Sequence, residues 1–404
     1  MKKVKIAIWL DKSYHSKAGG GFSYYDKLVH IIDSYHFDSS VEVCFAIESP
    51  NADHLSLKKE VINLYYYKRL PVRLSYSVSK IPVIGSWIIS RIEKKYKKIL
   101  NDASVRVIYY IRQTECKISG FPFIATNWDI AHCSTFAFPE AINAGAFSFS
   151  FALRHHFYTQ ILPQALMIFA ESEAGKNELI KYTNIDGKKI KVVPIFAGNC
   201  VNVKYEEQED EEFLNEKQLE KQKYFFYPAQ FWAHKNHTGL LQAFAKFIEL
   251  YPGYKLVFTG SDKGNLEYIQ SFVSELKIED SVLFSGFLSE KQINILYHHA
   301  TALVMASYSG PTNMPPIEAM ELGCPVICSD LKGHYEILGD SAIYFNPADH
   351  DELCNAMIKM VQRRSFYSEE IENRNKQSVF KIECAIERIN EYFKEIATIR
   401  NCWR

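Results

Sequence analysis

The sequence lacks any hydrophobic run that approaches the roughly 18 residues needed to cross a membrane. Its N-terminal segment, residues 1–11, is basic and then apolar, but Asp11 makes the apolar part too short for a signal peptide. We therefore interpret this segment as a buried first strand.

The chain has no excess of either charge, because 47 lysine and arginine residues balance 47 aspartate and glutamate residues. A formal net charge of zero provides no field that attracts nucleic acid, so we expect no nucleic-acid partner. The nine cysteines are scattered and form no CxxC pair, so neither a disulfide framework nor a zinc site is indicated. A reducing cytoplasm suits such a chain.

What the sequence does contain is a long alternation of strand-like and helical segments, in a chain of 404 residues that exceeds one ordinary core. This alternation favours parallel sheets covered by helices, and its restart after residue 223 favours two doubly wound domains. The strand-like segments are residues 5–10, 41–47, 105–111, 121–126, 166–172 and 189–195, followed by 224–229, 254–260, 282–287, 301–306, 324–330 and 342–345.

These patterns predict an N-terminal domain over residues 1–198 and a C-terminal domain over residues 199–380. Residues 199–223 are acidic and poor in large apolar side chains, which is typical of a solvated linker that leads into a short helix. Residues 381–404 carry apolar side chains at helical spacing. We expect a terminal helix there, and a return to the N-terminal domain is one arrangement open to it.

One stretch, SGPTNMPPIEAMELGCPVICSD at residues 309–330, combines signals that define a helix N-terminus. Thr312 and Asn313 are good capping residues, proline suits the first helical turn, and Gly323 suits the C-terminal end. Such a helix mouth at the edge of a parallel sheet favours an anion, and Glu318 can accept hydrogen bonds from hydroxyls of the same ligand. Together they indicate a nucleoside-diphosphate site, although a core helix with a solvent-facing Glu318 is the alternative.

Further loops that follow strands lie at the same edge. Lys235, within YPAQFWAHKNH at residues 227–237, can neutralise a phosphate, or can be an ordinary surface lysine. The glycines in AGGGFSYYDKL at residues 18–28 permit close backbone approach to a ligand, or form a flexible loop. The remaining loops of this kind are residues 259–265 and 285–287.

With these segments in place, the chain resembles a family 4 retaining glycosyltransferase of the GT-B architecture. The resemblance spans almost the whole chain and is strongest over residues 224–350. It is carried by WDIAH (128–132), AESEAGKNEL (170–179), KIKVVPIFAG (189–198), YPAQFWAHKNH (227–237), residues 285–330 and GDSAIYFNPAD (339–349).

The resemblance implies two Rossmann-like domains that face each other across a cleft, with the sugar nucleotide held mainly by the second. Glu318 matches the glutamate that binds the donor ribose, and Lys235 matches the lysine on the donor diphosphate. Phe287 and Leu288 match the loop whose backbone reads the base.

In the first domain the resemblance assigns Gly20 and Gly21 to the glycine loop under the phosphate, and Ser172 to the segment that faces the donor. Asp129 and His132 match a segment on the acceptor side, where a tryptophan precedes the aspartate instead of the family's usual histidine. His132 is the candidate that works on the acceptor, and a buried structural histidine is the alternative.

Two positions depart from the family pattern. Gly310 stands where the first glutamate of the family's paired motif is expected, and Gln230 stands where arginine is common. We interpret these departures as a variant donor site, with an inactive protein as the alternative. In the place of the missing glutamate, backbone N–H groups of Thr312 and Asn313, next to Met314, would hold the sugar hydroxyls or the phosphate.

The implied function is a retaining, metal-independent transfer of a sugar from a nucleoside-diphosphate sugar to a hydroxyl of a saccharide or lipid-linked saccharide, in cell-surface polysaccharide or glycan assembly. Lys235, Glu318 and His132 would carry it, with no cofactor and no metal, and no DxD motif lies in a suitable loop. Two other classes stay open: a sugar-nucleotide epimerase of similar fold, and a non-catalytic nucleotide-binding protein.

Residues 65–99 combine basic side chains with tyrosines and a tryptophan, against one acid, Glu93. This pattern is typical of a surface for an anionic membrane and would suit a lipid-linked acceptor on the inner, cytoplasmic face. A solvated helix with a partly buried loop is the alternative. The basic residues are Lys68, Arg69, Arg73, Lys80, Arg91, Lys94, Lys95, Lys97 and Lys98.

Overall fold

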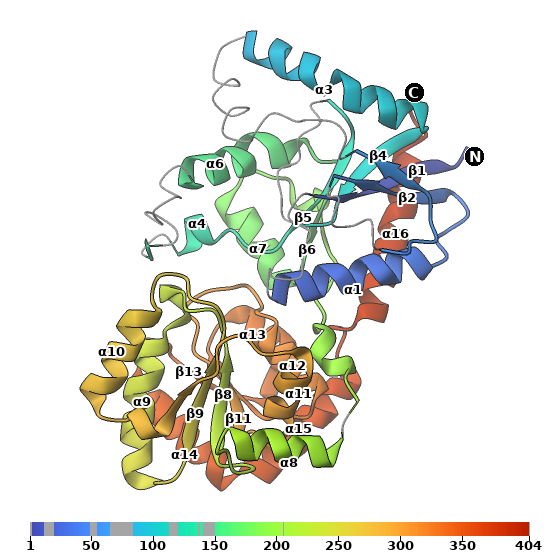
Figure 1. Ribbon diagram of the computed structural model, residues 1–404. Coiled ribbons are helices and arrows are strands. Elements are labelled where there is room, and N and C mark those ends of the chain that lie inside the picture. Colours follow the sequence, from blue (N-terminus) through green and yellow to red (C-terminus); the bar gives the residue numbers. More distant parts are fainter. Residues whose placement is uncertain are drawn as a thin grey trace. The chain divides into compact units, whose positions relative to one another are not determined.

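The computed structural model consists of two compact units, each with a parallel sheet covered by helices (Figure 1), which confirms the predicted α/β fold. The first unit comprises Met1–His132, Gly145–Pro194 and Ile382–Arg404, and the second comprises Cys133–Ala144 and Ile195–Lys381. The structure describes residues 2–11, 20–48, 55–64, 84–112, 120–135, 138–139, 150–204 and 206–403.

In the described part of the first unit, seven strands form one sheet in the order β3-β2-β1-β4-β5-β6-β7, with all neighbours parallel. Every residue of β1 is buried, because helices cover both faces of such a sheet. The strands are β1 (Val4–Leu10), β2 (Val41–Ile47), β3 (Val61–Asn63), β4 (Val105–Tyr110), β5 (Phe123–Asn127), β6 (Met167–Ala170) and β7 (Ile190–Val192).

Neighbouring residues of β4 show how the two faces of this sheet are filled, since successive side chains of a strand point in opposite directions. The ring of Tyr109 lies 5.7 Å from that of Phe393 on the C-terminal helix, whereas Tyr110 lies 5.6 Å from Trp9. Trp9 in turn lies 6.4 Å from Tyr96.

The C-terminal helix and the helix that carries Tyr96 therefore cover opposite faces (Figure 1). The helices of this unit are α1 (Gly20–Ser34), α3 (Ile84–Asp102), α6 (Ser150–His156), η4 (Phe157–Ile161), η5 (Leu162–Gln164), α7 (Glu173–Tyr182), η6 (Gly187–Lys189) and α16 (Ile382–Arg400), and the boundary between the units falls within α4 (Ala131–Ser134), after His132. Helix α16 is the terminal helix expected within residues 381–404, and it belongs to this first unit.

In the second unit six strands form a parallel sheet in the order β10-β9-β8-β11-β12-β13. The strand order reverses between β8 and β11, and ligands of open α/β sheets bind at the carboxyl ends of strands beside such a point. The strands are β8 (Tyr224–Pro228), β9 (Lys255–Thr259), β10 (Val282–Phe284), β11 (Ala302–Met305), β12 (Val326–Ser329) and β13 (Ile343–Phe345).

Helices cover this second sheet in two groups: α9 packs with α10 and α14, and α12 packs with α13 and α15 (Figure 1). The helices are η7 (Asn199–Asn202), α8 (Glu207–Glu216), η8 (Ala233–Lys235), α9 (His237–Leu250), α10 (Leu266–Leu276), η9 (Glu279–Ser281), α11 (Glu290–His299), α12 (Pro315–Glu321), α13 (Lys332–Leu338), η10 (Gly339–Ser341), α14 (His350–Gln362) and α15 (Arg364–Gln377).

The expected linker, residues 199–223, contains the packed helix α8. Asp210, Phe213 and Leu214 of this helix are buried, and the Asp210 carboxylate lies 2.9 Å from the His299 ring. The acidic composition of the segment therefore describes its exposed face, while its few apolar residues pack on the second unit.

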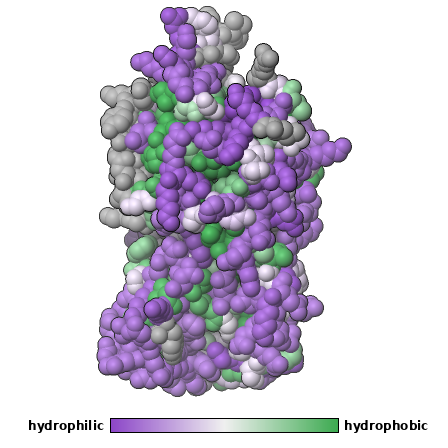
Figure 2. Space-filling model, turned by 90° about the vertical axis from the view of Figure 1, so that its right-hand side faces the viewer, coloured by the Kyte–Doolittle hydropathy of each residue, from purple (hydrophilic) through white to green (hydrophobic). Residues whose placement is uncertain are grey.

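The described helices include none that is both long and apolar enough to span a bilayer. The face drawn in Figure 2 is mostly hydrophilic, and its hydrophobic residues form separate patches.

Candidate functional site

Two loops of the second unit meet at the carboxyl ends of β8 and β11. Lys235 ends η8, which follows β8, and Asn313 follows β11. The Lys235 ammonium donates a hydrogen bond of 2.7 Å to Oδ1 of Asn313. The structure thus brings together two predicted site residues that are 78 positions apart in the sequence.

The backbone from which Lys235 extends is held from several directions. The Tyr227 hydroxyl donates to the Lys235 carbonyl over 2.6 Å. The Tyr308 N–H donates to the carbonyl of His234 over 2.8 Å. Next in the chain, Asn236 adopts a left-handed conformation and caps α9. The lysine side chain is half-buried, so its ammonium group has a restricted range of positions.

Asn313 and Gly310 fit each other closely. Asn313 has a φ of 64°, a left-handed conformation that asparagine tolerates better than most residues. Gly310 has a φ of 116°, and a Cβ atom there would lie 2.8 Å from both polar atoms of the Asn313 amide. A glutamate at position 310, as in the family pattern, would strain the backbone and collide with this amide, which explains the departure.

The expectation that Thr312 and Asn313 cap the following helix is wrong. Helix α12 begins at Pro315, its N-cap residue is Met314, and no side chain caps it. Thr312 is buried, and the Asn313 amide is turned toward Lys235. The proline at the first helical position and a left-handed glycine after the last turn, with φ of 68°, are as predicted.

Glu318 lies in the first turn of α12 and is half-buried. Its Oε2 accepts a hydrogen bond of 2.9 Å from the hydroxyl of Tyr297 on α11. Burial, and the adjacent charge of Glu318, raise the pKa of Tyr297 well above its usual value, so the phenol stays a donor. The sequence analysis missed Tyr297, because its spacing marks it only as a core residue of a helix.

The remaining predicted donor residues of this unit differ in exposure. Phe287, in the loop after β10, is 71% exposed, whereas the adjacent Leu288 is buried. The side-chain oxygen of Gln230 accepts a hydrogen bond of 3.0 Å from the Trp232 indole. An exposed ring beside the sheet edge is available for stacking, and Gln230 is fixed by its neighbour.

In the first unit, Gly20 and Gly21 are the first two residues of α1, which follows β1. Residues 12–19, the rest of the glycine-containing turn, lie outside the described residues. Ser172 is fully buried and caps α7: its hydroxyl accepts from the Gly175 N–H over 2.9 Å and lies 3.1 Å from the Glu171 carboxyl. Its local role is therefore that of a helix cap.

Asp129 follows β5 and lies two residues before the start of α4. Its Oδ1 accepts the Ala131 N–H over 2.9 Å and pairs with the Arg154 guanidinium over 2.5 Å. The hydroxyl of Tyr158 bonds to the side chain of Asn127 over 2.8 Å and to the Asp129 carbonyl. This network anchors α4 to η4.

His132 lies on α4 and is only 1% exposed, with its ring centroid 4.9 Å from that of Tyr158. Burial, reinforced by the charge of Arg154, lowers the pKa of His132 to about 4. The imidazole is therefore neutral at physiological pH and can donate one hydrogen bond and accept another.

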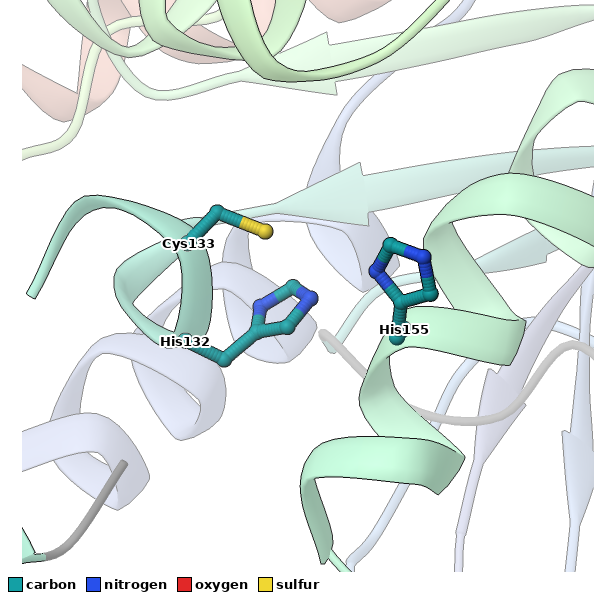
Figure 3. A group of neighbouring side chains, drawn as sticks. All are labelled: His132, Cys133 and His155. Carbon is teal, nitrogen blue, oxygen red and sulfur yellow. The ribbon is translucent and has the colours of Figure 1, made fainter. Parts of the chain in front are cut away.

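His132 also belongs to a group that the sequence analysis did not find (Figure 3). One ligand atom each of His132, Cys133 and His155 lies within 4.8 Å of the others, and such a group can hold a metal ion. Two imidazoles and a thiol are a ligand set that Zn²⁺ accepts. The CxxC criterion could not reveal this group, because its members come from two helices, α4 and α6.

Glu171, directly after β6, is a second titratable residue that the sequence analysis missed. It is only 3% exposed, and burial raises its pKa well above the usual value, reinforced by the charges of Asp129 and Glu178. A Cβ atom at Gly175 would lie 2.3 Å from the Glu171 carboxyl, so this glycine makes room for it. Burial therefore favours the neutral form of this carboxyl, which lies directly beside Ser172.

Comparison with known proteins is consistent with this architecture. Two parallel α/β units define the GT-B class of glycosyltransferase folds, which confirms the fold expected from the resemblance. Residues 208–377 match the model of the family Glycosyl transferases group 1. The chain is also 30% identical over 197 residues to the O-antigen chain mannosyltransferase RfbU of Salmonella typhimurium, a match that covers 48% of this chain and 51% of RfbU.

The chain thus spans about half the length of the curated relatives it matches. Among solved structures, a glycosyltransferase from Rickettsia africae superimposes with a TM-score of 0.72 at 14% identity, over 98% of this chain and 99% of that one. Anabaena HepE in complex with UDP and glucose superimposes with a TM-score of 0.69 at 16% identity, over 97% of this chain and 100% of that one. At these identities the similarity concerns the fold.

The buried carboxyl of Glu171 leads to a prediction about stability. Because its pKa is raised in the folded state, the folded protein loses stability as pH rises above the ordinary value of 4.5, at up to about 1.4 kcal/mol per pH unit until the folded pKa is reached. Glu171→Gln removes this loss, so we expect the melting temperature of the variant to rise relative to that of the parent as the pH increases above the ordinary glutamate pKa of 4.5.

Thermal unfolding followed by circular dichroism across this pH range measures the difference. Glu173→Gln, at an exposed carboxylate two residues further on, is the matched control and should follow the parent. If the melting temperatures of Glu171→Gln and the parent differed by the same amount at every pH, burial would not be raising the pKa of this carboxyl.

Proposed function

We propose that this protein is a retaining glycosyltransferase. It moves a sugar from a nucleoside-diphosphate sugar to a hydroxyl of a saccharide or lipid-linked saccharide in cell-surface polysaccharide assembly. The observation that carries the proposal is the convergence of Lys235, Asn313 and Glu318 on loops and a helix that follow β8 and β11, where the strand order reverses. RfbU, named an O-antigen chain mannosyltransferase, and HepE, solved with UDP and glucose, support it.

The donor contacts follow from the chemistry of each group. Glu318, held by Tyr297, presents a carboxylate to the ribose hydroxyls. The exposed ring of Phe287 lies beside the base. The Lys235 ammonium, held by the oxygen of the Asn313 amide, faces the diphosphate.

The transfer itself needs stabilisation of the departing diphosphate. The bond between the anomeric carbon and the phosphate oxygen breaks, and the acceptor oxygen bonds to that carbon on the same face. The acceptor proton passes to the departing phosphate, whose growing negative charge Lys235 stabilises without a metal ion. His132, a neutral imidazole, hydrogen-bonds the transferred sugar or the acceptor.

Substitutions of Glu318 and Lys235 should affect different quantities, nucleotide affinity for Glu318 and kcat for Lys235. Glu318→Gln weakens a charge-assisted bond to the ribose, at a cost of roughly 1–3 kcal/mol in nucleotide affinity. That cost should be absent for a 2′,3′-dideoxy analogue. Lys235→Ala should lower kcat more than donor affinity, because the charge it stabilises grows in the transition state.

Calorimetry with UDP, GDP and ADP identifies the nucleotide that the parent binds. The affinities for this nucleotide and for its 2′,3′-dideoxy analogue are then measured in the parent and in both variants. An equal loss for both ligands in Glu318→Gln would rule out the ribose contact. Incubation with donor alone tests the epimerase alternative, since an epimerised sugar nucleotide would overturn the proposed transfer.

His132 is tested through turnover. His132→Ala should lower kcat while donor affinity stays nearly unchanged, because the imidazole acts on the sugar or acceptor. The assay contains EDTA, so that no ion held by the group in Figure 3 contributes. Cys133→Ser and His155→Ala are controls with parent turnover, and a His132→Ala variant that only melts earlier would mark a structural histidine.

We further propose that α3 contacts an anionic membrane surface, which would bring the enzyme to a lipid-linked acceptor at the cytoplasmic face. One side of α3 packs on the sheet through buried Tyr96 and Leu100. The other side carries Trp87, 59% exposed, with the Arg91 guanidinium 5.2 Å from its ring, and exposed Lys94, Lys95 and Lys98. Lys97 of the predicted surface is half-buried, and Lys68, Arg69, Arg73 and Lys80 lie outside the described residues.

Charge reversal on this helix tests the membrane contact. Lys94, Lys95 and Lys98, all replaced by glutamate, should abolish cosedimentation with phosphatidylglycerol-containing vesicles, since attraction to an anionic surface is electrostatic. Binding of the parent should weaken with added salt, because mobile ions screen that attraction.

A control variant with the same change in net charge carries glutamate at three exposed lysines outside α3, Lys181, Lys188 and Lys277. This control should bind the vesicles like the parent. Binding of the parent that salt does not weaken, or no binding by the parent, would contradict the proposal.

A further inference from the structure

We propose that His334 is a positioning residue for Lys235: it orients the Asn313 amide so that its oxygen faces the lysine ammonium. This inference rests on the proposed function, in which Lys235 stabilises the departing diphosphate. His334 was not among the residues that the sequence analysis singled out. It lies on α13, the helix that follows β12, and its side chain is fully buried.

The hydrogen bonds around His334 determine where its proton lies. Nδ1 is 2.8 Å from the carbonyl oxygen of Ser329, which can only accept, so Nδ1 carries the hydrogen. The Ser329 hydroxyl has a better acceptor of its own in the Ser307 carbonyl at 2.7 Å. Burial, together with the charge of Lys235, lowers the pKa of His334 to about 4. The imidazole is therefore neutral, and Nε2 is an acceptor.

The acceptor at Nε2 in turn orients Asn313. Nδ2 of Asn313 lies 3.1 Å from Nε2 of His334 and 3.4 Å from the Ser309 carbonyl, and both of these atoms accept. The amide NH₂ group is thus committed to this side, and Oδ1 points to Lys235 at 2.7 Å. Rotation of the amide by half a turn would place its NH₂ group against the ammonium and leave Nε2 facing an oxygen.

The backbone shows that this contact is a close-fitting one. A Cβ atom at Gly333 would lie 1.1 Å from the Pro311 carbonyl oxygen, so only glycine lets the first turn of α13 approach the loop that carries Asn313. On the other side, Gly310 leaves the space that the Asn313 amide fills. Glycines on both sides therefore allow the imidazole and the amide to meet.

The arrangement has a specific electrostatic consequence. A carboxylate in the place of Asn313 would also hold Lys235, but it would cancel the positive charge. A neutral amide oxygen fixes the position of the ammonium without cancelling any of its charge. Because the ammonium is already in place, little reorganisation is needed when negative charge develops on the departing group.

Two substitutions of His334 separate its two hydrogen bonds. The amide of glutamine reaches the position of Nε2 and can still accept from Asn313, whereas the shorter asparagine can replace Nδ1 toward Ser329 only. We expect His334→Asn to lower kcat about tenfold, the effect of one lost hydrogen bond, and to weaken nucleotide binding by a smaller factor. His334→Gln should retain most of the parent kcat.

A double-mutant cycle with Lys235→Ala tests whether His334 acts through the lysine. The readout is calorimetric affinity for the nucleoside diphosphate that the parent binds best among UDP, GDP and ADP, which can be measured even when turnover is lost. His334→Asn should weaken binding in the parent and have no further effect once Lys235 is alanine. An equal loss in both backgrounds, or equal losses of kcat for His334→Asn and His334→Gln, would overturn the inference.

Asn313→Asp provides a test that leaves the histidine in place. Aspartate also tolerates the left-handed conformation, so folding should be retained. Its carboxylate would neutralise Lys235, and we expect kcat to fall about tenfold or more as the charge available to the diphosphate is lost. Parent kcat in a folded Asn313→Asp protein would contradict the inference. Parent kcat in Lys235→Ala would instead contradict the proposed function itself.

Discussion

The polar network of the second unit depends on one constraint, the parallel alignment of all the strands in its sheet. Because every strand runs in the same direction, the loops after β8, β11 and β12 emerge at the same edge, although long segments of chain separate them. Lys235, Asn313 and His334 each lie just beyond one of these strands. An antiparallel partner among them would move one of the three side chains to the opposite edge.

Two basic side chains near the candidate site residues, one in each unit, are held by different means. In the first unit Arg154 is paired with the carboxylate of Asp129, so the pair carries no net charge and serves to join α4 to its neighbours. In the second unit the Lys235 ammonium donates to the oxygen of an uncharged amide, a contact that cancels none of its charge. The first arrangement suits a structural connection, and the second suits a group that must meet an anionic ligand.

The sequence was sufficient to predict features that depend on local chemistry and periodicity. The two parallel sheets, the proline start of α12 and the left-handed Gly323 follow from strand-helix alternation and backbone preferences. Tyr297, His334 and Glu171 could not be predicted, because their roles arise from contacts or burial that only the folded chain provides. The capping assignment failed for a related reason: asparagine suits both a helix cap and a left-handed turn, and only the neighbours of Asn313 decide between them.

The close approach of Gly333 to the Pro311 carbonyl has a consequence for engineering. Positions 310, 313, 333 and 334 form one interlocking set, so a single exchange toward the paired-glutamate pattern would introduce a side chain for which the neighbouring loop has no space. To change the donor preference by grafting, the whole segment from β11 through α13 would have to be replaced together. Libraries that vary these sites one at a time would sample mostly misfitting combinations.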